Sequence, residues 1–308
     1  MDTVLIALGG NAILKRGEDA TFPTQYKNVK NAAKSMVNLL SKEDIKLVIT
    51  HGNGPQVGGE LLRNEYAERQ IPQLPLYVLT AETQAFIGSM LEAAMLNEMH
   101  RKTVDKRISA VLTHVLVDRH DKAFGRPTKP IGPHYSKKEL ERRLRCGRFD
   151  FVETGGAYRR VVPSPEPLEV IELESIRRML DSGHIVIAGG GGGIPMAESK
   201  GAITGVDAVI DKDATSQLLA SELKADKLII LTDAECLYME YGNESSGIID
   251  INAGDLKKML GSFQGGTIKP KVEACIKFVE NGGKEAYIGN LFKLTELLDR
   301  KSGTRITR

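Results

Sequence analysis

Three lysines stand at positions from which they could bind phosphate groups, and two aspartates beside one of them could fix its ammonium group or hold a cation. Lys212 lies directly between Asp211 and Asp213, Lys271 lies at the start of a predicted helix, and Lys129 is bracketed by two prolines. Phosphoryl transfer requires positioning and charge neutralisation more than covalent chemistry from the protein, and ammonium groups supply the neutralising charge. The residues therefore predict a phosphate site. For each taken alone, the alternative is a helix cap or a solvated surface charge.

Three glycine-rich turns offer backbone N–H groups as a second set of anion ligands. A short apolar run precedes each turn, and the turns contain Gly9, Gly10 and Asn11; Gly52, Asn53 and Gly54; and residues 189–193. Glycine lets a ligand approach the backbone, and a helix N-terminus attracts anions. Because ligands bind at the carboxyl ends of strands in parallel sheets, we expect the three turns to form one anion site. The alternative is that they are ordinary strand–helix turns.

Strands and helices alternate along most of the chain. The predicted strands are 4–8, 47–50, 109–117, 184–188, 227–232 and 285–288, and the predicted helices are 24–42, 56–69, 81–100, 168–180, 214–223 and 268–280. This alternation predicts an α/β fold with a mostly parallel sheet and helices on both faces. Asp233 follows one predicted strand and should lie at the edge that carries the turns. His114 should be a hydrogen-bonded structural residue rather than a ligand.

Residues 118–167 differ from the rest of the chain, because they are rich in proline, glycine and charge and have weak periodicity. We interpret them as an insertion that protrudes from the main sheet. Pro130 restricts the backbone of Lys129, so this lysine could be held over a site by a stiff hairpin. The alternative is an exposed loop lysine.

Composition excludes several other classes of protein. The 308 residues are 41% hydrophobic and 27% charged, with a net charge of +2, which gives no reason to expect nucleic acid as a partner. No apolar run reaches the roughly 18 residues of a membrane span. The three cysteines fit neither a zinc site nor a disulfide framework, and no signal sequence is seen, so we expect a cytoplasmic protein. P-loop, protein-kinase and HExxH motifs are absent.

Motifs across nearly the whole chain closely resemble those of the carbamate kinases, within the amino-acid kinase superfamily. The matching segments are 7–12, 51–58 (HGNGPQVG), 127–132 (PTKPIG), 161–165, 190–195, 209–213 (VIDKD) and 270–274. The resemblance implies a three-layer α/β/α sandwich with a small protruding subdomain at 118–167. It implies one domain over 1–308, with a carbamate-side half of about 1–205 and a nucleotide-side half of about 206–308.

The resemblance also implies an activity, which is the reversible, Mg²⁺-dependent reaction ATP + carbamate = ADP + carbamoyl phosphate. Transfer would be direct and in-line, in arginine catabolism that makes ATP, and the enzyme would be a homodimer. ATP/ADP and Mg²⁺ are the expected cofactors, and no membrane or nucleic acid partner is expected. Two other classes remain open, namely another small-molecule kinase of the superfamily and a non-catalytic nucleotide-binding homologue.

Roles for individual residues follow from the same resemblance. Lys129, Lys212, Asp213 and Lys271 are the expected catalytic residues, and Gly9, Gly10, Asn11, Gly52, Asn53 and Gly54 are the expected substrate-binding residues. Lys212, Asp213, Asp233, Tyr241, Gly242 and Lys271 are expected to bind the nucleotide. No protein residue is assigned as a metal ligand. The chain departs from the family pattern at Gly156 and Tyr158, which could alter closure of the protruding subdomain.

Overall fold

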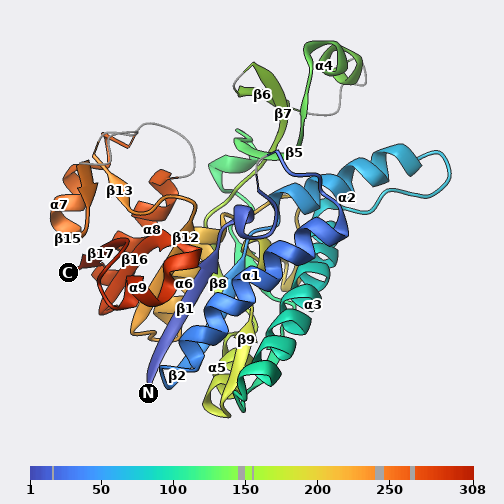
Figure 1. Cartoon of the computed structure of the whole chain (residues 1–308). Helices are drawn as coiled ribbons and strands as arrows, with labels where there is room; N and C mark the ends of the chain where they lie inside the picture. The colour runs from blue at the N-terminus through green and yellow to red at the C-terminus, as the bar shows by residue number, and fades with distance from the viewer. Residues whose placement is uncertain (16, 145–149, 155, 240–245, 264–267) are drawn as a thin grey trace.

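A computed structural model describes residues 1–15, 17–144, 150–154, 156–239, 246–263 and 268–308. Its centre is an eight-stranded sheet of order β15-β17-β16-β12-β1-β2-β9-β3 (Figure 1). The strands are β1 (Asp2–Leu8), β2 (Ile45–His51), β3 (Arg107–Ala110), β9 (His184–Ile187), β12 (Lys227–Thr232), β15 (Asp250–Asn252), β16 (Glu285–Asn290) and β17 (Thr304–Thr307). All neighbours are parallel except β16 and β17, which confirms the predicted mostly parallel α/β sheet.

Helices cover both faces of this sheet. The first face carries α1 (Phe22–Leu40), α3 (Leu76–Lys102) and α9 (Leu294–Leu298), and the second carries α5 (Leu173–Asp181), α6 (Lys212–Glu222), α7 (Ala253–Lys258) and α8 (Ile268–Glu280). Strand β1 shows why both faces are covered. Val4 and Ile6 belong to the apolar core on the first face, and Leu5 and Ala7 belong to the core on the second face. Alternate residues of a strand point to opposite faces, so a strand with apolar residues at both parities must be covered on both sides.

A second sheet corrects one sequence prediction. It has the order β11-β10-β4-β8 and consists of β4 (His114–Val117), β8 (Pro167–Val170), β10 (Ile194–Ser199) and β11 (Ala202–Gly205). The predicted strand 109–117 is therefore wrong, because its two ends lie in different sheets. The chain leaves the first sheet after Val111, whose N–H still donates to the carbonyl oxygen of Ile187 at 2.8 Å. At Thr113 the N–H and C=O are both bonded to the side chain of Gln84, at 2.9 and 3.1 Å. The carbonyl oxygen of Thr113 also accepts the N–H of Ile194 in β10 at 2.8 Å, so the Gln84 side chain supplements the backbone partner from the second sheet.

The predicted helix 168–180 also starts too early. Residues of β8 pair with β4 in an antiparallel ladder, and the helix α5 begins only at Leu173. Strand pairing with a distant segment overrides the local helical pattern here. His114 was interpreted correctly as a hydrogen-bonded residue, since its Nδ1 lies 2.7 Å from a carboxylate oxygen of Glu172. Strands β10, β11, β15 and β17 were not predicted.

A small sheet projects from the main body above α2 (Gly54–Ala67) (Figure 1). It has the order β5-β7-β6, with β5 (Lys129–Tyr135), β6 (Asp150–Thr154) and β7 (Ala157–Val162), and together with α4 (Lys137–Leu144) it is called the flap below. A separate apolar cluster that includes Val57, Ile131 and Val162 joins the flap to α2. A further two-stranded ribbon consists of β13 (Leu237–Tyr238) and β14 (Gly247–Ile248). None of the described helices is long and apolar enough to cross a membrane.

Candidate active site

The three predicted glycine turns meet at one edge of the main sheet. Strands β1, β2 and β9 are neighbours, and their carboxyl ends lead into η1 (Gly10–Ala12), α2 and η3 (Gly190–Gly192). The first two turns touch, because a Cβ atom added at Gly52 would lie only 3.4 Å from the backbone nitrogen of Gly10. The same added atom would lie 3.9 Å from Cδ of Lys212. The turns therefore lie next to the side chain of Lys212, the first residue of α6.

Helix α6 begins beside these turns, and Asp211 is its N-cap. The Asp211 carboxylate accepts hydrogen bonds from the N–H groups of Asp213, at 2.8 Å, and Ala214, at 3.4 Å. Two hydroxyl groups of the same helix fix it to the sheet edge. Thr215 donates to the carbonyl oxygen of Gly192 at 2.7 Å, and the Oγ atom of Ser216 lies 2.6 Å from the hydroxyl of Thr50. The side chains in the first turn of α6 are thus held at the turns.

One buried carboxylate joins two of the predicted lysines. The Nζ atom of Lys212 lies 2.5 Å from one oxygen of Asp213, and the Nζ atom of Lys271, from α8, lies 2.7 Å from the other. Asp213 is 4% exposed, and the two lysines are 9% and 7% exposed. Two ammonium groups are therefore desolvated and fixed at one point. Ammonium groups held in this way need no reorganisation to receive a phosphoryl group.

The third lysine, Lys129, belongs to the flap. Lys129, at the start of β5, forms an ion pair with Asp211, the N-cap of α6. Lys129, Asp211, Lys212, Asp213 and Lys271 thus form a contiguous lysine–aspartate cluster of three positive and two negative groups. Asp211 was not among the predicted site residues. Its position predicted a helix cap or a partner for the adjacent Lys212, but its pairing with a lysine 82 residues earlier in the chain is a tertiary contact.

Electrostatics keep both carboxylates of the cluster ionised. Burial by itself would raise the pKa of Asp213, but Lys212 and Lys271 overcome this effect and hold that pKa well below its usual range. Burial also opposes ionisation of Asp211, whose pKa is held low mainly by Lys129. Burial lowers the pKa of Lys212, and the positive charge of Lys271 adds to that effect. An incoming anion would relieve the repulsion between these two lysines.

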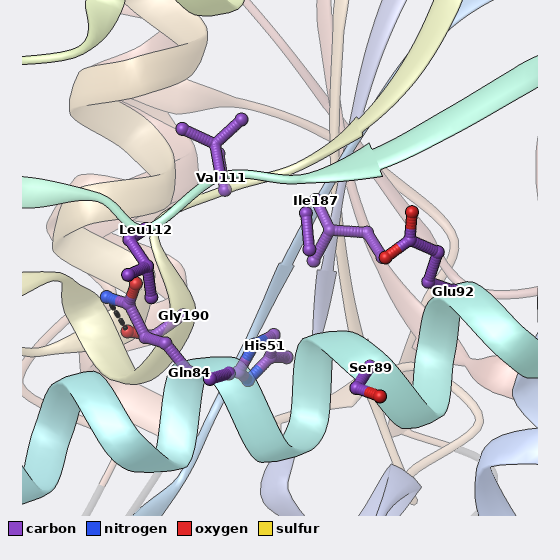
Figure 2. A pocket seen from close by; sticks show the side chains of 11 residues that line it. His51, Gln84, Ser89, Glu92, Val111, Leu112, Ile187 and Gly190 are labelled. Atoms are coloured by element: carbon purple, nitrogen blue, oxygen red, sulfur yellow. Dashed lines mark hydrogen bonds between the residues drawn. The ribbon is translucent and has the colours of Figure 1, made fainter.

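A cavity of about 220 Å³ lies between α3 and the ends of β3 and β9 (Figure 2). Its lining includes His51, Gln84, Ser89, Glu92 and Leu112, and none of the five cluster residues. Burial lowers the pKa of His51 to about 4, so the imidazole is neutral near pH 7, and its Nδ1 lies 3.1 Å from the carbonyl oxygen of Gly52. A cavity with a carboxylate and no lysine or arginine in its lining does not suit phosphate groups.

The predicted substrate-binding residues occupy different environments. Gly9 packs closely on β12, since an added Cβ would lie 2.9 Å from the carbonyl oxygen of Leu231. Gly54 begins α2, and Asn11 lies in η1. The buried side chain of Asn53 donates from Nδ2 to the hydroxyl of Thr83 at 2.9 Å, so this amide nitrogen is already bound to α3. Substrate binding by these residues stays a prediction.

The predicted nucleotide-binding residues are only partly described. Asp233 follows β12, the neighbour of β1, and therefore lies at the same sheet edge. Its backbone carbonyl accepts a hydrogen bond from Asn290 at 3.0 Å. Tyr241 and Gly242 lie outside the described residues. Among those that are described, no group of three or more histidine, cysteine, aspartate or glutamate side chains could hold a metal ion.

Fold and site together define a class of enzyme, the small-molecule kinases described by the amino acid kinase family model, which matches residues 2–290. A carbamate kinase from Pyrococcus horikoshii is 42% identical over 99% of both chains, and one from Staphylococcus haemolyticus is 42% identical over the whole of both chains. The solved structure of a carbamate kinase from Giardia lamblia bound to AMP-PNP has a TM-score of 0.91, at 39% identity over 99% of this chain and 98% of the other. The chain belongs to the carbamate kinases of the amino acid kinase family and is an enzyme of class EC 2.7.2.2.

Proposed function

We propose that the enzyme catalyses direct, reversible transfer of the γ-phosphoryl group of ATP to carbamate, giving ADP and carbamoyl phosphate. The observation that carries this proposal is the lysine–aspartate cluster beside the contacting turns at Gly10 and Gly52. It offers three ammonium groups and backbone donors around one small volume. In a transfer between two anions, the protein's main task is to offset charge repulsion and align the reactants.

In this proposal each part of the cluster has a distinct role. Lys129 and Lys271 hold oxygens of the transferred phosphoryl group, and Lys212 acts at the nucleotide phosphates. Asp213 orients Lys212 and Lys271, which its two oxygens already contact. Carbamate binds at the backbone of the turns that contain Gly9, Gly10, Asn11, Gly52, Asn53 and Gly54. Its own anionic oxygen attacks phosphorus, so no general base is required.

Each half of the chain would bind one of the two substrates. Residues of about 1–205 would hold carbamate and those of about 206–308 the nucleotide, with Asp233, Tyr241 and Gly242 beside the adenosine part. The insertion at 118–167, which contains the flap, would cover the site and bring Lys129 to it. The AMP-PNP bound to the relative from Giardia lamblia supports an adenine nucleotide as the phosphoryl donor here.

Mg²⁺ is the proposed cofactor, and the residues fit an ion carried mainly by the nucleotide. Mg²⁺ typically binds substrate phosphates, waters and one or two carboxylates rather than a cage of protein ligands. The described residues contain no such cage, and Asp213 is the buried carboxylate among the phosphate-binding lysines. The ion would supply further neutralisation of phosphate charge. The proposed setting is arginine catabolism in the cytoplasm, with the reaction running toward ATP.

We also propose a homodimer, formed through α3 and the adjacent edge of the main sheet. Among the strands of the described residues, β3 is an edge strand of the main sheet and has no partner on its outer side. Large apolar side chains lie exposed on α3, with Phe86 at 36% and Leu96 at 49%, and just after β3, with Leu112 at 50%. Phe86 and Leu96 share one face of α3 with Ser89, so an apolar helix face continues toward the free strand edge. Exposed apolar patches of this kind mark protein interfaces.

The activity is tested by measuring ATP formation from ADP and carbamoyl phosphate with Mg²⁺, with acetyl phosphate as a competing donor. A strong preference for carbamoyl phosphate is expected. Equal or better use of acetyl phosphate would instead indicate another small-molecule kinase of the family. If ADP binds and neither donor yields ATP, the proposal is wrong.

A further inference from the structure

We infer that Asp211 is a positioning residue that holds the flap lysine, Lys129, at the head of α6 in readiness for the phosphoryl group. This inference rests on the proposed function, in which Lys129 contacts that group. It adds a role toward Lys129 for a residue that the sequence indicated as a helix cap or as a partner of Lys212.

The two oxygens of Asp211 are used differently. Its Oδ1 accepts the capping hydrogen bonds from Asp213 and Ala214, which fix the carboxylate to the helix. Its Oδ2 accepts the hydrogen bond from Nζ of Lys129. Because the cap fixes the direction of Oδ2, the ammonium group of a long and flexible side chain is held at one place. Freezing such a side chain in advance removes an entropy cost from the catalytic step.

The position of Asp211 makes this contact useful rather than incidental. Asp211 is two residues from Asp213, which holds the other two lysines, so the three ammonium groups gather around the first turn of one helix. The pair is partly screened from water, with 30% of the Lys129 side chain and 27% of the Asp211 side chain exposed. An arriving phosphoryl oxygen can therefore reach Lys129 and compete with Oδ2 for its protons.

The contact also ties the flap to the body of the enzyme. Lys129 is the first residue of β5. Its partner Asp211 is the N-cap of α6, one of the helices that cover the second face of the main sheet. Further anchors of the flap are the packing of β5 on α2 and the ion pair of Arg160 in β7 with Glu65 in α2, at 2.8 Å. Asp211 thus sets the position of a catalytic side chain and of the strand that carries it.

The test uses two variants that keep the cap and remove the charge. Asparagine and serine are good N-cap residues, so Asp211→Asn and Asp211→Ser should retain α6 while they release Lys129. We expect kcat to fall at least ~10-fold in both, with the KM for ADP changed by less than ~2-fold, as for loss of an interaction in the transition state. In a Lys129→Met background, either substitution should lower kcat no further.

A chemical readout tests the contact without relying on activity. Reductive methylation, followed by peptide mass spectrometry, measures the accessibility of each lysine. Methylation of Lys129 should accelerate severalfold in both Asp211 variants. The matched control is Asp181→Asn, which releases Lys46 from a similar pair (2.7 Å) at the start of β2. It should accelerate methylation of Lys46 and leave kcat unchanged.

Each result bears on a different claim. Unchanged methylation of Lys129 in both Asp211 variants would overturn the inference, as would a loss of kcat that is the same with and without Lys129. Full activity of Lys129→Met would overturn both the role of Lys129 and the inference. If the wild-type enzyme makes no ATP from carbamoyl phosphate, the proposed function fails, whereas the methylation experiment still decides whether Asp211 holds Lys129.

Discussion

At the scale of single residues, the site is an arrangement of desolvated charges. Lys271 illustrates this, because its ammonium group lies in the first turn of α8, where the helix dipole disfavours a cation. It is nonetheless buried, and Asp213 is its partner at 2.7 Å. Lys269, two residues earlier, is exposed, and its Nζ atom lies 3.9 Å from a carboxylate oxygen of Glu273. The two lysines of one segment therefore have different environments, and only one can act in the cluster.

This difference gives a matched pair of variants. We expect Lys271→Met to lower kcat at least ~100-fold, comparable to loss of an oxyanion-binding donor at about 2.7 kcal/mol or more. Lys269→Met should retain nearly full kcat, because its side chain makes no contact with Asp213. Steady-state formation of ATP measures both. Equal losses in the two variants would contradict the assignment of Lys271.

His51 makes a prediction about stability and pH. Its pKa is lowered from 6.5 to about 4, first by burial and then by the charge of Lys212. The unfolded chain binds this proton at a higher pH than the folded protein, so the contribution to stability is present above pH 6.5 and is lost as pH falls toward 4. Between pH 7 and pH 5 the loss from His51 alone should be about 2 kcal/mol.

The measurement compares urea unfolding of the wild type and of His51→Asn at these two pH values. The asparagine amide can still donate toward Gly52, but it does not titrate. The variant should therefore lose about 2 kcal/mol less stability than the wild type over this interval. Identical pH dependence in the two proteins would show that His51 does not titrate as its burial implies.

At the scale of elements, the flap depends on a contact between two backbones. A Cβ atom added at Gly58 of α2 would lie 2.0 Å from Cα of Gly132 in β5, and backbone atoms cannot move aside cheaply. Gly132 itself has a φ of +71°, a conformation that favours glycine, and Arg159 donates to its carbonyl oxygen at 3.0 and 3.2 Å. The glycine at position 58 therefore sets the distance between α2 and the strand that carries Lys129.

We expect Gly58→Ala to push β5 away from α2 and displace Lys129, lowering kcat at least ~10-fold. Gly59→Ala is the control, since a Cβ at that neighbouring position meets nothing within 4 Å. Alanine should even stabilise the helix there, by up to about 1 kcal/mol. Activity assays and thermal unfolding of the two variants distinguish the cases. A fully active Gly58→Ala would mean that the flap does not depend on this contact.

At the scale of the whole molecule, the main sheet gathers distant segments at the carboxyl ends of its strands. Its outermost strand on one side, β3, is left unpaired among the described residues. The cluster residues come from β5, α6 and α8, and the turns come from β1, β2 and β9, so neither half of the chain builds the site alone. The free edge is β3, beside the exposed apolar face of α3. The site and the proposed dimer surface therefore lie at different places on the same sheet.

The proposed dimer can be tested at that surface. Leu112→Asp places a charge beside the free edge of β3 and should shift the protein from dimer to monomer in analytical ultracentrifugation. Ile249→Asp is a suitable control, because Ile249 is similarly exposed, at 54%, but lies between β14 and β15 near the opposite edge of the sheet. Dissociation by both substitutions, or by neither, would argue against the proposed interface.

The sequence determined the features that depend on neighbours along the chain. Apolar strands ending in glycine, and helices with one apolar face, were enough to predict the parallel α/β sheet and the meeting of the turns at Gly10 and Gly52, because parallel strands must end at a common edge. Motif spacing identified the family. Lys212 and Asp213 were predicted as site residues because they belong to one of these motifs, VIDKD, which is contiguous in the chain.

Only the tertiary structure decided which groups pair across the fold. A continuous apolar run is divided between two sheets because Val111 pairs with Ile187 of β9 whereas Thr113 pairs with Ile194 of β10. The segment 167–170 forms a strand because β4 is available as its partner. The pairing of Lys129 with Asp211 depends on where the flap is docked. Such contacts join residues tens of positions apart, so no local pattern carries them, and they arise only when packing fixes the relative positions of elements.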